Sequence, residues 1–249
     1  MSSPAKEDLI LTTAFSVTSA DTDMYNRLRP GGLMNYLIQA SIQSADSLGF
    51  GFGGLRKQHL FWVLSRLTLD IYRPLQWYES LEVETWAKDV EKLIYLRDYI
   101  VRDGEKQEVA RGTSGWLAID QQTKRPKRLE GVEAEIFEQL RERHGLERSP
   151  LKLARARDGQ LYEIQPTYYD FDLNRHVTST RYIDWMMDTF SFDFHGKHYP
   201  RHLSVNYMKE TRPRETLRMY RDQEDETTYQ FEGIHATTGK PSFRGKVDF

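Results

Sequence analysis

The sequence lacks several features that each mark a class of protein. It contains no cysteine, so disulfides, thiolate–metal sites and cysteine nucleophiles are excluded. No apolar run reaches the roughly 18 residues that a membrane-spanning helix needs. The 35 Lys and Arg nearly balance the 37 Asp and Glu, so the net charge of −2 gives no overall attraction to nucleic acid or anionic lipid. Residues 1–8 also lack the basic and apolar segments of a signal peptide, so we expect a globular, cytoplasmic protein.

Short matches within the chain indicate two similar halves. Three dipeptides recur in the same order: Leu-Ser at 64–65 and 203–204, Arg-Pro at 73–74 and 212–213, and Arg-Gly at 111–112 and 244–245. The first two pairs are also the same distance apart in each half. Together the matches predict a duplicated fold.

Each half is predicted to contain one helix followed by long antiparallel strands. Apolar residues recur at helical spacing from Met34 to Leu48 and again from Tyr182 to Thr189. Strand-like patterns occur at 59–72, 81–86, 93–101, 109–119, 202–210, 216–221, 227–235 and 243–249. An α+β architecture, with a curled sheet wrapped around each helix, buries these apolar faces. We place the boundary between two domains, 1–150 and 151–249, in a linker that follows a charged, helical stretch at 132–144.

The segment 168–177 concentrates polar side chains just before the second predicted helix. Asp172, Asn174 and His176 alternate, so an extended backbone projects them to one side. The N-terminus of a helix adds free N–H groups suited to a developing oxyanion. A plain turn with an exposed histidine is the alternative. The corresponding turn of the first half, residues 23–29, has no histidine, which favours a catalytic role for this group.

A second difference between the halves concerns Glu210. In the register set by the Leu-Ser dipeptides, Glu210 falls where Ile71 falls, at the end of an apolar strand face that includes Phe61 and Val63. A carboxylate on an inward face is costly unless it is hydrogen-bonded or paired. We expect Glu210 to meet His176 and to orient or activate a water. The alternative is a sheet rim, where Glu210 reaches solvent.

Several motifs in the same order resemble those of one enzyme family. The chain has Asp172-x-Asn174-x-His176-Val177 followed by Tyr-Ile-x-Trp at 182–185, where the family has Asp-x-Asn-x-His-Val-Asn-Asn-x-x-Tyr-Ile-x-Trp. Tyr-Met-Lys-Glu-Thr at 207–211 stands where the family has Tyr-Arg-Arg-Glu-Cys. Segments 61–66, 70–86, 96–99 and 110–116 resemble the N-terminal half of that family. The family is that of the acyl-acyl-carrier-protein (acyl-ACP) thioesterases, best known from plant plastids, and the lack of a transit peptide fits a bacterial-type member.

The resemblance implies both a fold and an activity. The fold is a tandem pair of hotdog domains, and the activity is hydrolysis of fatty acyl-ACP to free fatty acid and holo-ACP, which ends fatty-acid elongation. The catalytic set would be Asp172, Asn174, His176 and Glu210, with no cofactor. Thr211 stands at the family's cysteine, so a cysteine nucleophile cannot operate, and we expect an activated water to hydrolyse the thioester. Asp172 either orients its neighbours or attacks directly to give a transient anhydride. An acyl-CoA thioesterase and a non-catalytic acyl-thioester-binding protein are the alternatives.

Candidate substrate-binding residues come from both halves. Met34, Leu37, Ile38 and Trp62 lie on the first helix and the strand after it, where an alkyl chain could lodge; core packing is the alternative. The acyl carrier protein is acidic, so its docking surface should be basic. Arg212 and Arg214, near Glu210, are the preferred candidates, and the basic run 124–128 is a second.

Two further expectations concern metals and assembly. His195, His198 and His202 have a spacing that suits one helical face, but Gly196 and Pro200 predict a loop and no metal site. A duplicated fold could supply within one chain the pairing that single hotdog domains obtain as dimers. The sequence is therefore compatible with a monomer or a homodimer.

Overall fold

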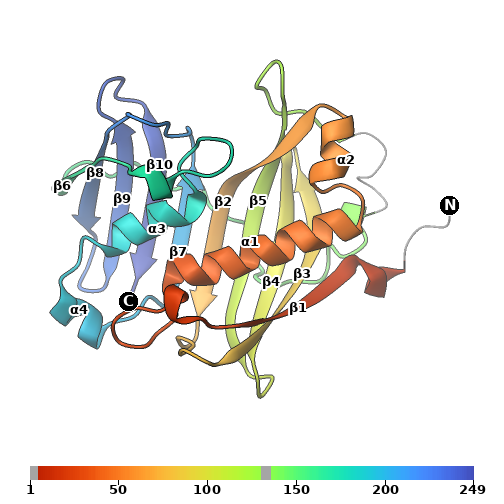
Figure 1. Cartoon of the computed structure of the whole chain (residues 1–249), viewed down its shortest axis with the longest axis horizontal. Helices are drawn as coiled ribbons and strands as arrows, with labels where there is room; N and C mark the ends of the chain where they lie inside the picture. Colours follow the sequence, from red (N-terminus) through yellow and green to blue (C-terminus); the bar gives the residue numbers. More distant parts are fainter. Residues whose placement is uncertain (1–4, 130–135) are drawn as a thin grey trace.

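The computed structural model describes residues 5–129 and 136–249, in which ten strands form one antiparallel sheet (Figure 1). The strand order is β1-β3-β4-β5-β2-β7-β10-β9-β8-β6. The first half contributes β1 (Ile10–Ser16), β2 (Leu60–Ile71), β3 (Ser80–Glu91), β4 (Ile94–Asp103) and β5 (Glu108–Asp120). The second contributes β6 (Gln160–Ile164), β7 (His202–Tyr207), β8 (Leu217–Gln223), β9 (Thr228–His235) and β10 (Pro241–Asp248). The helices are α1 (Pro30–Ser47), α2 (Phe52–Lys57), α3 (Ser179–Met187) and α4 (Phe192–Lys197).

The two halves meet where β2 pairs with β7, from Arg66 opposite Asn206 to Asp70 opposite His202. Figure 1 shows α1 crossing the sheet of the first half and the shorter α3 crossing that of the second. This is the predicted α+β double hotdog, with one sheet wrapped around two helices. No helix in the described part of the chain is both long and apolar enough to cross a membrane.

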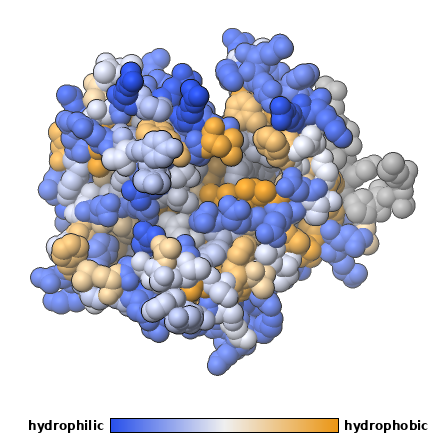
Figure 2. Space-filling view, in the orientation of Figure 1, coloured by the Kyte–Doolittle hydropathy of each residue, from blue (hydrophilic) through white to orange (hydrophobic). Residues whose placement is uncertain are grey.

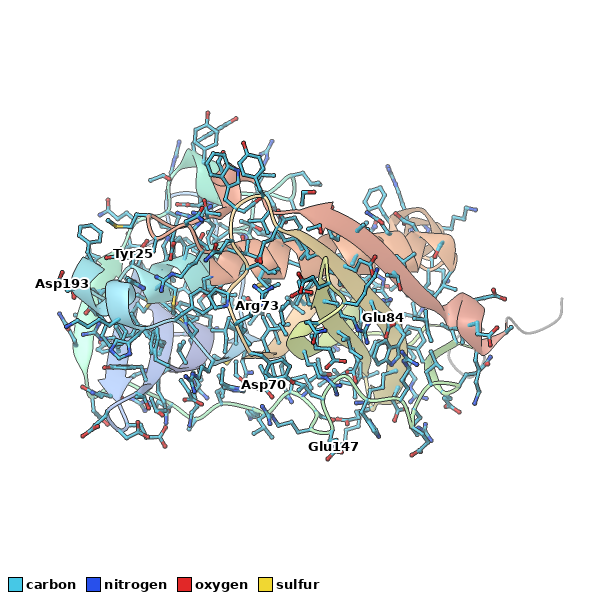
Figure 3. The ribbon with its side chains drawn as sticks, turned by 90° about the horizontal axis from the view of Figure 1, so that it is seen from below. Tyr25, Asp70, Arg73, Glu84, Glu147 and Asp193 are labelled. Carbon is cyan, nitrogen blue, oxygen red and sulfur yellow. The ribbon has the colours of Figure 1, made fainter. Side chains whose placement is uncertain are left out.

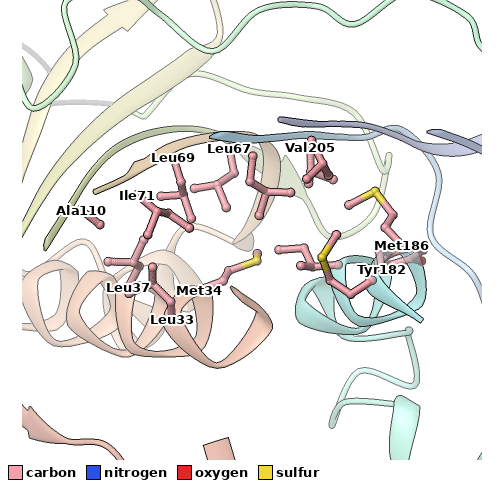
Figure 4. Close-up of a cluster of buried hydrophobic side chains, with 14 of the residues drawn as sticks. Leu33, Met34, Leu37, Leu67, Leu69, Ile71, Ala110, Tyr182, Met186 and Val205 are labelled. Carbon is pink, nitrogen blue, oxygen red and sulfur yellow. The ribbon is translucent and has the colours of Figure 1, made fainter. Parts of the chain in front are cut away.

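The two helices share one hydrophobic core rather than each having its own. Met34 and Leu37 of α1 and Met186 of α3 belong to the same buried cluster, together with strand residues from both halves (Figure 4). A second cluster lies toward the other end of α1 and contains Trp86 and Tyr95. The prediction of helices with apolar faces is confirmed. Gly49, with φ of +81°, stands just after α1, as its expected C-terminal position requires.

The prediction of which β2 side chains face the core is wrong for the first half of the strand. The register shifts between Leu64 and Arg66, which marks a β-bulge. A bulge adds one residue and moves the following side chains to the other face. Trp62 therefore packs against buried residues and Val63 is exposed. After the bulge, Leu67, Leu69 and Ile71 are buried, as expected.

The register between the halves also differs from the prediction. Gly112 lies opposite Leu69 on β2, and Gly245 lies opposite Val205 on β7. Matching the two Arg-Gly dipeptides therefore aligns Val205 with Leu69, whereas matching the Leu-Ser dipeptides aligns Leu203 with Leu64, so the two matches set different registers. Strand β7 ends at Tyr207. Glu210 lies beyond that strand, so the expectation that it ends an inward face is wrong.

The connection between the halves follows the outer face of the sheet. The backbone N–H of Gly145 donates to Asp98, and Lys88 donates to Asp98 and to the carbonyl of Leu146. Of the helix expected at 132–144, residues 132–135 lie outside the described residues. Residues 136–137 are π-helical, and 138–142 form a bend and turns rather than an α-helix. The domain boundary near residue 150 stays a prediction.

Candidate functional site

The turn before α3 is built by one carboxylate. Oδ1 of Asp172 accepts the backbone N–H of Asn174 at 2.8 Å and that of His176 at 3.1 Å. The N–H of Asp172 in turn donates to the carbonyl of His176. Arg175 takes a positive φ of 61° at the tip. Asp172 therefore fixes the backbone on which Asn174 and His176 stand.

The first half contains the same turn. Oδ1 of Asp23 accepts the N–H groups of Tyr25 and Arg27, both at 2.9 Å, and Asn26 has φ of 64°. Tyr25 thus stands at the position of Asn174, and Arg27 at that of His176. The aspartate is a requirement of the turn in both halves, whereas an amide and an imidazole occupy these two positions in the second half alone.

Asp170 anchors this turn to the start of α3, a role that sequence reasoning missed. Its carboxylate accepts the N–H and hydroxyl of Thr167 and the Nε–H of Arg181, and it is almost completely buried. Its carbonyl accepts the N–H of Thr178 at 2.9 Å. The first half shows the matching Thr18–Asp21 contact, so the repeated Thr-x-x-Asp spacing was the available signal.

The loop after β7 brings Glu210 to the turn. The carbonyl of Thr211 accepts the N–H of Val177 at 3.0 Å, which ties the two segments together beside His176. His176 Nε2 lies 3.9 Å from Oε1 of Glu210, and Arg212 Nη2 donates to the same oxygen at 2.7 Å. The expectation that Glu210 meets His176 is thus correct in space, although the strand argument that led to it is not.

Both side chains of this pair are half-buried and reachable from solvent. The exposed fractions are 33% for the His176 side chain and 43% for that of Glu210. Partial burial raises the pKa of Glu210, but the hydrogen bond from Arg212 and the electrostatic interactions with His176 and Arg212 outweigh it. The pKa of Glu210 therefore lies below its ordinary value, and at neutral pH this group is a carboxylate.

Two side chains of the equivalent turn of the first half are bonded to residues of α4 and its flanks. Tyr25 donates its hydroxyl hydrogen to the carbonyl of Phe192, and Arg27 donates to the carbonyls of His195 and His198. Figure 3 shows Tyr25 close to Asp193, at the start of this helix. Of the two turns, the one with His176 is therefore the candidate active site.

Two of the three histidines considered for a metal have polar side-chain partners elsewhere. His195 lies in α4, not in the expected loop, and its Nε2 is 2.9 Å from the carbonyl of Met187. His202 contacts Asp70 through Nδ1 and Ser204 through Nε2. Among the described residues, no group of three or more His, Asp or Glu side chains could hold a metal ion.

The predicted acyl-binding residues fall into two places. Met34 Sδ lies 3.5 Å from the hydroxyl of Tyr207, which also donates to the carbonyl of Ser179 at the start of α3. Met34, with Leu37 and the partly buried Ile38 of the same helix, is thus close to the candidate site. Trp62 lies apart from these residues, against the second cluster, and its indole N–H donates to the carbonyl of Phe50.

Comparison with known proteins defines the class of this double hotdog. Residues 8–140 match the family model for the acyl-ACP thioesterase N-terminal domain, and residues 153–249 match that for the C-terminal domain. The chain belongs to the acyl-ACP thioesterase family.

Among its relatives, the chain is 28% identical to oleoyl-acyl carrier protein thioesterase 1 of Arabidopsis thaliana over 195 residues, covering 72% of this chain and 54% of that one. It is 27% identical over 223 residues to an acyl-[acyl-carrier-protein] hydrolase of Cuphea viscosissima, covering 84% and 53%. The chain therefore spans about half the length of the curated relatives it matches.

Solved structures extend the likeness over the whole chain. An acyl-ACP thioesterase from Bacteroides thetaiotaomicron superposes with a TM-score of 0.87 at 26% identity, covering 99% of this chain and 100% of that one. The 12:0-ACP thioesterase from Umbellularia californica has the same fold, with a TM-score of 0.82 at 20% identity, covering 96% of each chain.

Proposed function

We propose that this protein hydrolyses fatty acyl-ACP to free fatty acid and holo-ACP, and so ends fatty-acid elongation. The single observation that carries the proposal is the His176–Glu210 pair, which stands in one half of a duplicated fold, while the counterpart turn has Arg27 in place of the histidine. Membership of the acyl-ACP thioesterase family supports the substrate class.

In the proposed mechanism, Glu210 accepts a hydrogen bond from one imidazole nitrogen of His176, and the other imidazole nitrogen removes a proton from a water. The water oxygen forms a bond to the thioester carbon, and the carbonyl oxygen becomes an oxyanion. Collapse of this intermediate breaks the C–S bond, and the proton held by His176 passes to the departing sulfur. Water and thioester are thus converted to acid and thiol without any other reactant.

The oxyanion would be stabilised by Asn174 and by an N–H at the start of α3. The N–H groups of Val177 and Thr178 already donate to Thr211 and Asp170. The helix donors in our proposal are therefore those of Ser179 or Thr180, where the positive end of the helix dipole also lies.

For Asp172, the contacts support the orienting role. One carboxylate oxygen already accepts two backbone N–H groups of the turn, and Asp23 makes the same contacts in a turn that has no histidine. We propose that Asp172 positions Asn174 and His176 and does not attack the thioester.

The acyl chain is proposed to enter between the two halves. Figure 2 shows a hollow there, with hydrophobic side chains at its base and the two halves of the molecule on either side. Met34, Leu37 and Ile38 of α1 are the proposed contacts nearest to the site, and Trp62 a more distant one. Arg212 and Arg214, both exposed, are the proposed contacts for the acidic carrier. Residence in the cytoplasm and assembly as a monomer or homodimer stay predictions.

Rates of free-acid release from matched acyl-ACP and acyl-CoA panels test the substrate assignment. We expect faster hydrolysis of acyl-ACP at one or a few chain lengths. Equal or faster hydrolysis of acyl-CoA would replace the proposal with a CoA thioesterase. Stoichiometric binding of acyl-ACP without turnover would leave a binding protein.

A further inference from the structure

Arg212 and His176 approach the same oxygen atom. Arg212 Nη2 donates to Oε1 of Glu210 at 2.7 Å, whereas His176 Nε2 is 3.9 Å from that atom. A hydrogen bond between nitrogen and a carboxylate oxygen spans about 2.7–3.2 Å. Glu210 is therefore bonded to Arg212 and stands just outside hydrogen-bonding distance of His176.

The backbone around this group is held in place. Lys209 N–H donates to the carbonyl of Ser242 at 3.1 Å, and the Thr211 carbonyl accepts the N–H of Val177 at 3.0 Å, so the residues on both sides of Glu210 are fixed. The N–H of Arg212 donates to Oε2 of Glu215 at 2.8 Å. Bringing Glu210 to His176 thus requires the rotation of side chains and no movement of the loop.

Arg212 is placed where a partner could displace it. Its side chain is 63% exposed, and exposed ion pairs of this kind are weak. Arg214, two residues further on, is also exposed. An anion arriving at these two arginines would compete with Glu210 for the Arg212 guanidinium.

We propose that Arg212 is a latch on Glu210 that the acyl carrier releases. In the free protein, Arg212 holds Glu210 away from His176. An anionic group of the carrier, either the phosphate of its prosthetic arm or a surface carboxylate, draws Arg212 away, and Glu210 then closes on His176. Because the carrier binds the released state better, its binding shifts the population toward the competent pair. This inference rests on the proposed hydrolase function, and it makes Arg212 a positioning residue that couples carrier recognition to catalysis.

The test compares three thioesters of one acyl chain: acyl-pantetheine, acyl-phosphopantetheine and acyl-ACP. For Arg212→Ala, kcat/KM for acyl-pantetheine should rise about threefold, the size of a weak exposed ion pair. For acyl-ACP it should fall about tenfold, because a charge-assisted contact to the carrier is lost. Arg155→Ala, which removes an exposed arginine from the linker, is the matched control and should change neither rate. If acyl-phosphopantetheine behaves as acyl-ACP does, the phosphate is the releasing anion; if it behaves as acyl-pantetheine does, a carrier carboxylate is.

A fall for all three substrates with Arg212→Ala, or no change for any, would overturn the latch. A crystal structure of Arg212→Ala provides a readout independent of activity. We expect Glu210 Oε1 to lie about 2.8 Å from His176 Nε2 in it. An unchanged separation would overturn the latch even if the enzyme is active. Lack of wild-type hydrolysis with a shortened separation would instead overturn the proposed function and leave the latch standing.

Discussion

Two residues with the same backbone contacts, Asp23 and Asp172, separate what the turn requires from what the chemistry requires. Each aspartate accepts two backbone N–H groups of its own turn. The sequence was sufficient to group Asp172, Asn174 and His176, because their spacing is local. It could not assign the role of Asp172 or the bond between Arg212 and Glu210, because both depend on which way individual side chains turn.

The role of Asp172 is open to a direct test. Asparagine retains an oxygen that can accept the same two N–H groups, so Asp172→Asn should lower kcat/KM less than about tenfold. Asp172→Ala loses both hydrogen bonds, each of which contributes about 1 kcal/mol, and should lower both kcat/KM and the melting temperature. Steady-state kinetics and thermal unfolding of the two variants decide the matter. Loss of activity as complete in Asp172→Asn as in Asp172→Ala would identify the carboxylate as a nucleophile.

The lowered pKa of Glu210 leads us to expect that Arg212 sets the acidic limb of the pH profile of kcat/KM. The pKa of Glu210 lies below the ordinary value largely through Arg212, which counteracts the effect of burial. As pH falls through that pKa, Glu210 gains a proton and no longer supports His176 as a base, so kcat/KM should decline. Arg212→Ala removes the stabilising cation and should move this acidic limb to higher pH. An acidic limb at the same pH in the variant and the wild type would show that Glu210 does not control it.

At the scale of elements, the helices were easier to predict than the strands. Apolar spacing located α1 and α3 well, because one face of each is buried along its whole length. The bulge in β2 could not be predicted, because an extra residue leaves no mark on local composition. Asp184 of α3 is a charged residue whose side chain nevertheless faces α1, and burial raises its pKa against the opposing effect of Arg181.

The contact between α1 and α3 should depend on Gly31. A Cβ at this position would collide with Oδ1 of Asp184 and lie 3.3 Å from the carbonyl of Thr180. Gly31→Ala should therefore lower the free energy of unfolding by about 1–3 kcal/mol, the usual cost of overpacking. Gly53, which lies in α2 with nothing within 4 Å of an added Cβ, is the matched control. Gly53→Ala should be neutral or slightly stabilising in urea unfolding. Equal stabilities of the two variants would contradict this packing.

For the whole molecule, the duplication predicted from short matches is real, but the halves are not independent. The β2–β7 pairing and the cluster containing Met34 and Met186 cross the boundary between them. The sequence predicted two sheets around two helices, and could not predict that they join into one. Which edges pair is a property of the assembled chain, not of either half.

The second half should therefore not fold alone. The fragment 151–249 would expose the edge of β7 and the inner face of α3, which the first half covers in the intact chain. We expect this fragment to lack a cooperative unfolding transition as a monomer, and to regain it when it is mixed with the fragment 1–150. Circular dichroism during urea titration measures the unfolding transition of the fragment alone and of the mixture. A monomeric fragment that unfolds cooperatively would contradict the shared core.

The central claim, that His176 in the open turn activates water for thioester hydrolysis, is tested most directly by one comparison. Release of the carrier thiol from acyl-ACP would be followed for the wild type and for His176→Gln, with circular dichroism to confirm that both are folded. Loss of a general base should lower kcat about 100-fold or more. A folded His176→Gln variant that hydrolyses acyl-ACP as fast as the wild type would contradict the account.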